Sequence, residues 1–586
     1  MSNLHVTKAL GLQPVGNIEA ALKTYSKMTA INDGRHYYSI SESIPDEKLP
    51  LDYTHEINIS MTNANVDVTQ IHDSFITTVI TARINFSHDL VTRDNEISQA
   101  GKKLLESQFM FIGLRSGSNI ISDYCVVHGE DKIIDSTRQP NATIESFIYN
   151  TIKPKTEKDN RKHIHSLYDN VHKYDNSACG VYVPITLIKA GSYLDIDIPI
   201  SIPLDDILLF SGFIDYPNRL FGNLKLKYTI KPEALVYCRV SPKMSMIKTV
   251  GKRRNYFKSS QGQNYDSIMK MILTTPDSCF EYAKKFTQIN CPSRQFVFNY
   301  DLTAEGTVDG FNYETIIPEF TPTVTFCQTK DCKISIAGYS VSSQCLTNLI
   351  EYFSSHPFVV PSQRIETKRL GSAPTPSGFQ QCHDNLCFNH VMSTVTLFQK
   401  DTRHWTTFDN PQYKELQLYI GDRRFPEKPL NTTDATFFQM MLNASDLDSL
   451  FPATEEYEES LTSVKNNASE VFFPTTDDTS FMFTTQCERS GGTGICFDGI
   501  HTGNTPVSVE LRETPIYSGE TDTYYNVRDD LSQTARHPPA PLFNMVQQSF
   551  WIFSLKDGLN VQYVKDHTAE DVLRALGYTP TGELEE

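Results

Sequence analysis

The chain has 586 residues, of which 39% are hydrophobic and 11% aromatic, and its formal net charge is −17. This length predicts two or more domains, and the acidic balance argues against a dedicated nucleic-acid binder, which would usually be basic. No run of 18 apolar residues is present, so we expect no membrane insertion. The N-terminus also lacks the basic and apolar regions of a secretory signal.

Residues 1–50 show little periodicity, and we interpret them as an N-terminal arm. Strand signals begin near residue 56 and recur to about 240, which predicts a first jelly roll over 51–240. The clearest signal is SYLDIDIPISIPL, in which Asp195 and Asp197 lie opposite six apolar residues that share one side, namely Leu194, Ile196, Ile198, Ile200, Ile202 and Leu204. Pro199 and Pro203 favour an edge position or a bulge, since proline cannot donate a ladder hydrogen bond.

A poorly periodic stretch, 241–292, is interpreted as a connecting segment, and it holds a basic cluster of Lys248, Lys252, Arg253, Arg254 and Lys258. Eight short β-prone segments follow: QFVFNYDL, PTVTFC, KISIAGYSV, MSTVTLFQ, ELQLYI, SFMFTT, VSVELR and QSFWIFSL. Eight is the strand number of one jelly roll, so we predict a second roll over 293–565 and an acidic C-terminal tail over 566–586. No βαβ alternation appears. The predicted fold class is therefore all-β, with two consecutive eight-stranded antiparallel jelly-roll barrels and short helices in the loops.

Residues 425–452 read FPEKPLNTTDATFFQMMLNASDLDSLFP and predict a short helix behind a proline-rich turn. Thr433 or Asp434 is the expected cap. The positions that follow at helical spacing are Phe437, Met441, Ala444 and Leu447. A single apolar helix within a β domain is expected to cover an open end or edge of the barrel, so we assign it a packing role.

No constellation predicts catalysis, a cofactor or a metal, and we expect no enzyme. The segment CHDNLCFNH gathers Cys382, His383, Cys387 and His390, and Cys327 lies close to Cys332, but neither set has the paired spacing of zinc sites. The glycine-rich stretch 490–499 lacks the Lys-Ser/Thr of a phosphate loop. The basic cluster at 248–258 and a similar run at 153–165 have two open readings, a solvated loop or a patch facing nucleic acid or an acidic neighbour. The twelve cysteines show no disulfide framework and favour free thiols.

Three segments resemble a known family. They are GDRRFPEKPLNTTDATFFQMMLNASDLDSLFP, the C-terminal PIYSGETDTYYNV with RHPPAPLFNMVQQSFWIFSL, and IPLDDILLFSGFIDYPNRLFGNLKLKY. Together they resemble the double jelly-roll major capsid proteins. The nearest resemblance is to those of Polinton/Maverick-type elements and related double-stranded DNA viruses of the virophage/adenovirus lineage.

The resemblance implies two barrels side by side in one chain. It implies that three chains form a trimer with a nearly hexagonal outline, and that these pseudo-hexameric capsomers tile an icosahedral shell around double-stranded DNA. The implied partners are further copies of the chain, neighbouring capsomers, a penton or vertex protein, minor capsid proteins and, weakly, the packaged DNA. The implied location is the virion, assembled inside the host cell, with no cofactor.

Two other function classes stay open at this point. One is a β-sandwich carbohydrate-binding protein or glycoside hydrolase, against which the presence of only 2 Trp residues argues. The other is a different viral structural protein, such as a spike or a penton. A double strand series favours the major capsid protein, because single-barrel pentons are shorter.

Overall fold

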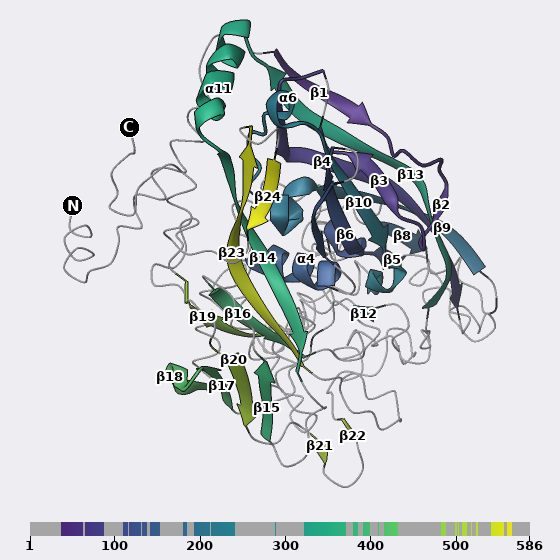
Figure 1. Cartoon of the computed structure of the whole chain (residues 1–586). Helices are drawn as coiled ribbons and strands as arrows, with labels where there is room; N and C mark the ends of the chain where they lie inside the picture. The colour runs from purple at the N-terminus through teal and green to yellow at the C-terminus, as the bar shows by residue number, and fades with distance from the viewer. Residues whose placement is uncertain are drawn as a thin grey trace, which may run out of the picture.

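The structure is a computed structural model of the whole chain (Figure 1). It consists mostly of antiparallel β-sheet with a few short helices. The residues that it describes are 37–62, 65–86, 109–114, 116–129, 132–137, 141–152, 180–184, 191, 193–210, 212–240, 287–288, 322–370, 379–384, 391–398, 408, 415–431, 482–487, 499–500, 502, 505, 507–512, 517–518, 523–524, 541–555 and 560–564.

The strands of the N-terminal part are β1 (Tyr37–Ser43), β2 (Leu51–Asp52), β3 (Ile57–Ser60), β4 (Val68–Phe86), β5 (Phe109–Gly113), β6 (Ile121–His128), β7 (Lys132–Thr137), β8 (Gly180–Pro184), β9 (Tyr193–Pro203), β10 (Leu224–Ile230), β11 (Val236–Val240), β12 (Thr287–Gln288) and β13 (Pro322–Ser340). Those of the C-terminal part are β14 (Phe358–Arg369), β15 (Phe379–Asp384), β16 (Val391–Leu397), β17 (Glu415–Ile420), β18 (Arg423–Asn431), β19 (Met482–Gln486), β20 (Val507–Arg512), β21 (Tyr517–Ser518), β22 (Thr523–Tyr524), β23 (Leu542–Ser554) and β24 (Asn560–Val564). The α-helices among the described residues are α4 (Asn141–Ile152), α6 (Asn218–Phe221) and α11 (Ser343–Ser355).

Two sheets form a first jelly roll. Sheet 1 has the order β1-β13-β4-β9, and sheet 2 has the order β3-β10-β6-β7. When these eight strands are numbered along the chain, the orders become 1-8-3-6 and 2-7-4-5, which is the arrangement that defines a jelly roll. The inward-facing residues of both sheets make one core, including Ile80 of β4, Ile198 of β9, Val126 of β6 and Leu226 of β10.

Two further sheets form a second jelly roll with the same strand order. Sheet 3 is β14-β23-β16-β19 and sheet 4 is β15-β20-β17-β18, which again reads 1-8-3-6 and 2-7-4-5. Their inner faces meet in a separate core that includes Val395 of β16, Leu418 of β17 and Val509 of β20. The predicted fold class, two eight-stranded antiparallel jelly rolls in succession, is confirmed by these pairings.

The predicted division of the chain differs from these pairings at β13. This strand lies beyond the predicted connecting segment 241–292 and inside the predicted second roll 293–565, yet it pairs with β4 and β1 in sheet 1. PTVTFC and KISIAGYSV are two parts of this one strand. The first roll also begins at β1, inside the predicted arm 1–50. Alternation identifies a strand but not its partner, and so the assignment of residues 322–340 to the second roll was wrong.

Helix α11 links β13 to β14 and therefore connects the two rolls (Figure 1). It begins behind Ser342, whose hydroxyl accepts a hydrogen bond from the Cys345 amide at 3.2 Å. One side of the helix is buried, with Cys345, Leu349 and Phe353 in the first core. The opposite side is open, and the Ile350 side chain there is 43% exposed.

The predicted alternation over 193–204 is confirmed. Ile196, Ile198, Ile200 and Ile202 are buried, whereas Asp195 and Asp197 point to the other face of sheet 1. Among the described residues β9 pairs only with β4, so it is an edge strand, as its prolines predicted. The predicted helix behind the cap Thr433 or Asp434 and the predicted acidic tail 566–586 lie outside the described residues.

Candidate functional site

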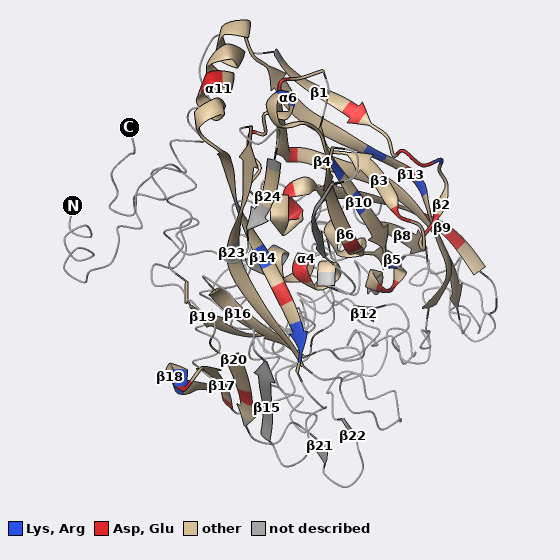
Figure 2. Cartoon of the chain, in the orientation of Figure 1, with Lys and Arg blue, Asp and Glu red and all other residues tan. Residues whose placement is uncertain are grey.

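The outer face of sheet 1 is the side of that sheet turned away from the first core. Three ion pairs cross between its strands, namely Glu42 with Lys333 at 2.7 Å, Asp197 with Lys330 at 2.6 Å and Asp195 with Arg83 at 2.6 Å. Figure 2 shows the resulting bands of both signs on the strands of sheet 1. The acids come from the edge strands β1 and β9, and the bases come from the central strands β4 and β13. These six charges are therefore paired across the face, and the exposed Asp331 of β13 also acts on Lys333.

Arg83 is the centre of a small cluster at one end of this face. Its guanidinium donates to both carboxylate oxygens of Asp195, from Nε at 2.6 Å and from Nη2 at 2.8 Å. These bonds hold the pKa of Asp195 below its usual range. The guanidinium also lies 4.5 Å from the ring centroid of Tyr193 and 5.8 Å from that of Phe326. Tyr193 is 65% exposed and Phe326 is 36% exposed.

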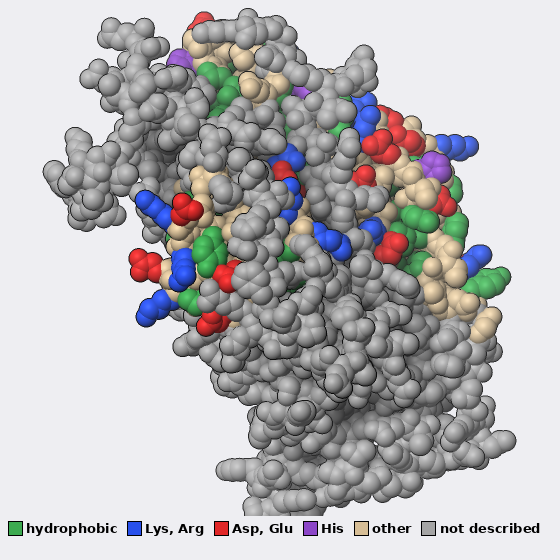
Figure 3. Space-filling view, turned by 60° about the horizontal axis from the view of Figure 1, so that its bottom comes forward, with side chains coloured by type: hydrophobic (Ala, Val, Ile, Leu, Met, Phe, Trp, Pro, Cys, Tyr) green, Lys and Arg blue, Asp and Glu red, His purple; other side chains and the backbone are tan. Residues whose placement is uncertain are grey.

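Apolar side chains are exposed at the other end of the same face. Tyr38 is 59% exposed and Ile40 is 61% exposed. Both share a side of β1 with Glu42, because side chains two residues apart in a strand point the same way. In the space-filling view, hydrophobic and charged side chains lie together along the right-hand side, where sheet 1 stands (Figure 3).

The seam between the rolls is the second feature. It is formed by the segment 204–221 of the first roll, together with α4, against β14 and the C-terminal half of β23. Phe213 packs edge-on against Trp551, with 5.5 Å between ring centroids, and Phe221 stacks on Phe358 at 5.3 Å. Phe553 also contacts these rings. Aromatic rings from both rolls therefore share one buried cluster, in which each aromatic pair contributes about 0.5–1.5 kcal/mol beyond its buried area.

Two further contacts cross the seam. The Ser362 hydroxyl of β14 donates to the Leu209 carbonyl at 3.0 Å, inside the protein. On α4, Phe147 lies 4.6 Å from Phe408, and Ile144 and Phe147 belong to the core of the second roll. Helix α4 stands between β7 and β9 in the chain, so a loop of the first roll completes the core of the second.

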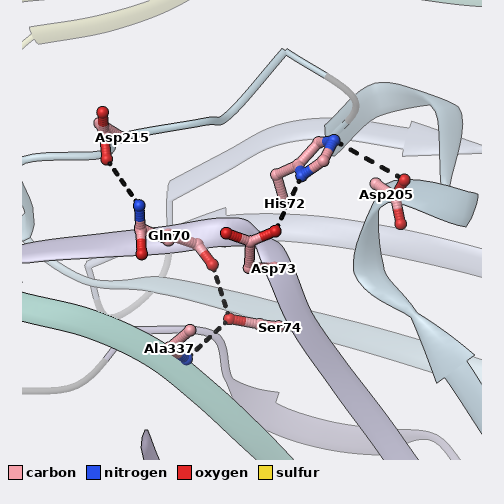
Figure 4. Close-up of polar contacts among 7 residues, drawn as sticks. All are labelled: Gln70, His72, Asp73, Ser74, Asp205, Asp215 and Ala337. Carbon is pink, nitrogen blue, oxygen red and sulfur yellow. Dashed lines mark hydrogen bonds and ion pairs between the residues drawn. The ribbon is translucent and has the colours of Figure 1, made fainter. Parts of the chain in front are cut away.

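Hydrogen bonds fix the segment 204–221 to β4 (Figure 4). The Gln70 amide donates to Asp215 at 3.2 Å, and the His72 backbone N–H donates to the Phe213 carbonyl at 3.0 Å. Within β4 itself, the Ser74 hydroxyl donates to the Gln70 carbonyl at 2.8 Å. His72 Nε2 lies 3.8 Å from the carboxylate of Asp205, which is 1% exposed. Beyond the view, the Arg219 guanidinium pairs with a carboxylate oxygen of Asp67 at 2.6 Å; the other oxygen of Asp67 accepts from the Val341 amide. The segment is held from several directions.

The loosely spaced cysteines are core residues. Cys327 and Cys332 lie on the inner side of β13 and are buried. Burial raises the pKa of the Cys327 thiol to about 12 and that of Cys332 to about 11. Within the part of the chain that the structure describes, no group of three or more His, Cys, Asp or Glu residues could hold a metal ion. The reading as ordinary packing residues fits this placement.

The raised thiol pKa values give a pH prediction. A thiol whose pKa is higher in the folded than in the unfolded protein contributes its full stabilisation at any pH below the unfolded-state pKa, which is near 9. This contribution is lost as the pH rises above that value. For Cys327 the loss extends from about pH 9 toward pH 12, at about 1.4 kcal/mol per pH unit. The variant Cys327→Ala is expected to show a shallower fall in the free energy of unfolding between pH 9 and 10.5, measured by urea titration.

The same two proteins provide a control below pH 8, where the thiol is protonated in both states. There the pH slopes of wild type and Cys327→Ala are expected to agree, although the variant is less stable because of the lost side-chain volume. Equal pH slopes above pH 9 would contradict the raised pKa of the Cys327 thiol.

Several predicted segments are placed only in part. Cys382 and His383 lie on β15, paired with β20, while Cys387 and His390 are outside the described residues. The glycine-rich stretch 490–499 is outside as well, apart from its last residue. So are both basic runs, at 153–165 and 248–258. None of the described helices is long and apolar enough to cross a membrane.

Sequence reasoning missed the seam and the pairing of the charges on sheet 1. The alternation predicts that Asp195 and Asp197 face solvent, but nothing in the sequence pairs them with Arg83 and Lys330, which lie 112 and 133 residues away along the chain. The signal for the seam was the dense apolar and aromatic run ILLFSGFIDY after β9. This run lies in a segment that resembles the capsid-protein family, but its spacing does not indicate a contact between two rolls.

Comparisons with known proteins were made for the whole chain. No family model matches it, and no curated protein matches its sequence. Among solved structures it is similar to PBCV-1 VP54 fitted into a reconstruction of the virophage Sputnik, with 8% identity, 91% of this chain and 97% of that chain covered, and a TM-score of 0.43. It is similar to the Faustovirus major capsid protein, with 8% identity, 91% of this chain and 97% of that chain covered, and a TM-score of 0.42. It is also similar to the mavirus major capsid protein, with 10% identity, 92% of each chain covered, and a TM-score of 0.42.

Proposed function

We propose that this chain is the major capsid protein of a double-stranded DNA virus or a Polinton-like element. Three copies would form a pseudo-hexameric capsomer, and these capsomers would tile an icosahedral shell. The protein acts by assembly and carries out no chemical reaction. Its place is the virion, and its assembly takes place inside the host cell.

The observation that carries this proposal is the pair of complete jelly rolls joined through a buried seam. Both rolls have the same strand order, and aromatic residues of each, such as Phe213 and Trp551, share one cluster. A chain with two similar jelly rolls in a fixed relation places six jelly rolls in a trimer of three copies. This matches the outline that the sequence resemblance implies, and symmetric closure is the usual rule for copies of one chain.

The proposed partners follow from that role. The chain binds its own copies, neighbouring capsomers, a vertex protein and minor capsid proteins, with weak contact to the packaged DNA. The contacts within a capsomer are expected to exceed about 2,000 Å² of buried surface, as in permanent assemblies. The contacts between capsomers are expected to be smaller and more polar.

The proposal is tested by the mass and shape of the purified full-length chain. Three chains of 66.5 kDa give a particle of about 200 kDa, which sedimentation measures directly. Negative-stain microscopy is expected to show particles with a hexagonal outline, or closed shells at high concentration. A stable monomer that binds or cleaves a glycan would refute the proposal and favour the carbohydrate-active alternative.

A further inference from the structure

We infer that the outer face of sheet 1 is a surface through which one copy of this chain binds a second copy. The inference rests on the proposed function, because it names a surface for the self-association that assembly requires. It is carried by the size of the face, its charge pattern and its exposed aromatic residues.

The face has the size that a specific interface needs. Its strands β1, β13, β4 and β9 contain 7, 19, 19 and 11 residues. With a rise of about 3.3 Å per residue and a strand spacing of about 4.8 Å, the face covers about 900 Å². A standard protein interface buries about 800 Å² on each partner. The outer face of sheet 1 is therefore large enough to form a standard interface with a second copy of the chain.

The charges on the face favour a second copy over a strongly charged partner. The whole chain carries a net charge of −17, so two copies repel each other over most approaches. On this face six of the charges form three balanced ion pairs, which reduces the like-charge repulsion that contact there would meet. The acids lie on edge strands and the bases on central strands.

Exposed side chains of the kind that anchor interfaces lie at both ends of the face. Arg83 lies against the rings of Tyr193 and Phe326 at one end, and Tyr38 and Ile40 are open at the other. Tyrosine and arginine are enriched among the residues that contribute most to binding. The Arg83 guanidinium is already held by Asp195 and the rings, so little side-chain freedom is lost when a partner covers it.

The experiment compares the wild-type chain with the double variant Tyr193→Ser/Phe326→Ser by sedimentation velocity over a range of concentrations. Both side chains are exposed, so the thermal unfolding midpoint is expected to stay at the wild-type value. Loss of two anchors is expected to weaken self-association by at least about 30-fold. The matched control is Ile350→Ser on α11, an exposed apolar residue outside sheet 1, which is expected to associate like wild type.

A second measurement uses the wild-type chain alone. Copies labelled with ¹⁴N and ¹⁵N are mixed and treated with an amine cross-linker, and cross-links between copies are identified by mass spectrometry. Lys330 and Lys333 are expected to form them, whereas Lys225 of sheet 2 is the control that is not. If both measurements place the contact elsewhere while wild type still assembles, the inference fails and the proposed function stands. A wild-type chain that stays monomeric at every concentration refutes both.

Discussion

The variant Trp551→Ala is expected to lower the free energy of unfolding by about 4 kcal/mol, the usual cost of truncating a large buried aromatic side chain. Trp551 is 0% exposed and stacks on Phe553, with 6.2 Å between ring centroids. The ring stands where the two rolls meet, so the cavity would have to be filled by groups from both. The measurement is the urea midpoint followed by circular dichroism, since the chain has only 2 Trp residues for fluorescence.

The matched control is Ile44→Ala. Ile44 is 74% exposed, so the change is expected to stay within about 0.5 kcal/mol. A double-mutant cycle then tests the seam itself. Phe213 belongs to the first roll and Trp551 to the second, and their rings are in contact. The pair Phe213→Ala and Trp551→Ala is expected to show a coupling of about 0.5–3 kcal/mol. Strict additivity would mean that the two rolls do not pack through these rings.

The variant Ile334→Asp is expected to destabilise the protein by more than about 4 kcal/mol, because it places a carboxylate in an apolar core without a partner. Ile334 is 0% exposed and pairs with Ile76 in the centre of sheet 1. We expect the variant to be found mainly in the insoluble fraction. The milder Ile334→Ala should remain soluble, with a thermal midpoint lowered by the loss of about 2–5 kcal/mol.

The neighbouring residue provides the control for this prediction. Lys333 points to the outer face of sheet 1, where its ion pair with Glu42 is about half exposed. Lys333→Asp removes that pair and sets two acids opposite each other, which is expected to cost no more than about 1 kcal/mol. Similar losses for Ile334→Asp and Lys333→Asp would show that residues 322–340 do not hold this register in sheet 1.

The sequence was most informative where one face of a strand is buried and the other is exposed to solvent. Over 193–204 the branched residues and the aspartates alternate, and burial follows that alternation. The same holds for Leu224 to Ile230, where every second residue is buried. Such strands could be predicted because the period of two is a local property of the backbone.

The sequence was least informative where strands are fully buried or short, or where pairing is distant. Strand β14 lies against β23 throughout its length, yet FVVPSQRIETKR shows no regular alternation and was not predicted. Its first residues are buried in the first core and Ile365 is buried in the second, so the two parts of the strand pack against different groups. A single periodicity cannot describe such a strand.

By itself, the amino-acid sequence determined that the chain is all-β, that it is long enough for two rolls, and which side of each amphipathic strand is buried. It did so because composition and alternation express the burial of each residue directly. Only the tertiary structure decided that β13 closes the first roll, that Arg83 and Lys330 neutralise the aspartates of β9, and that Phe213 and Trp551 meet in the seam. Those partners lie more than one hundred residues apart, and their choice depends on how whole sheets pack.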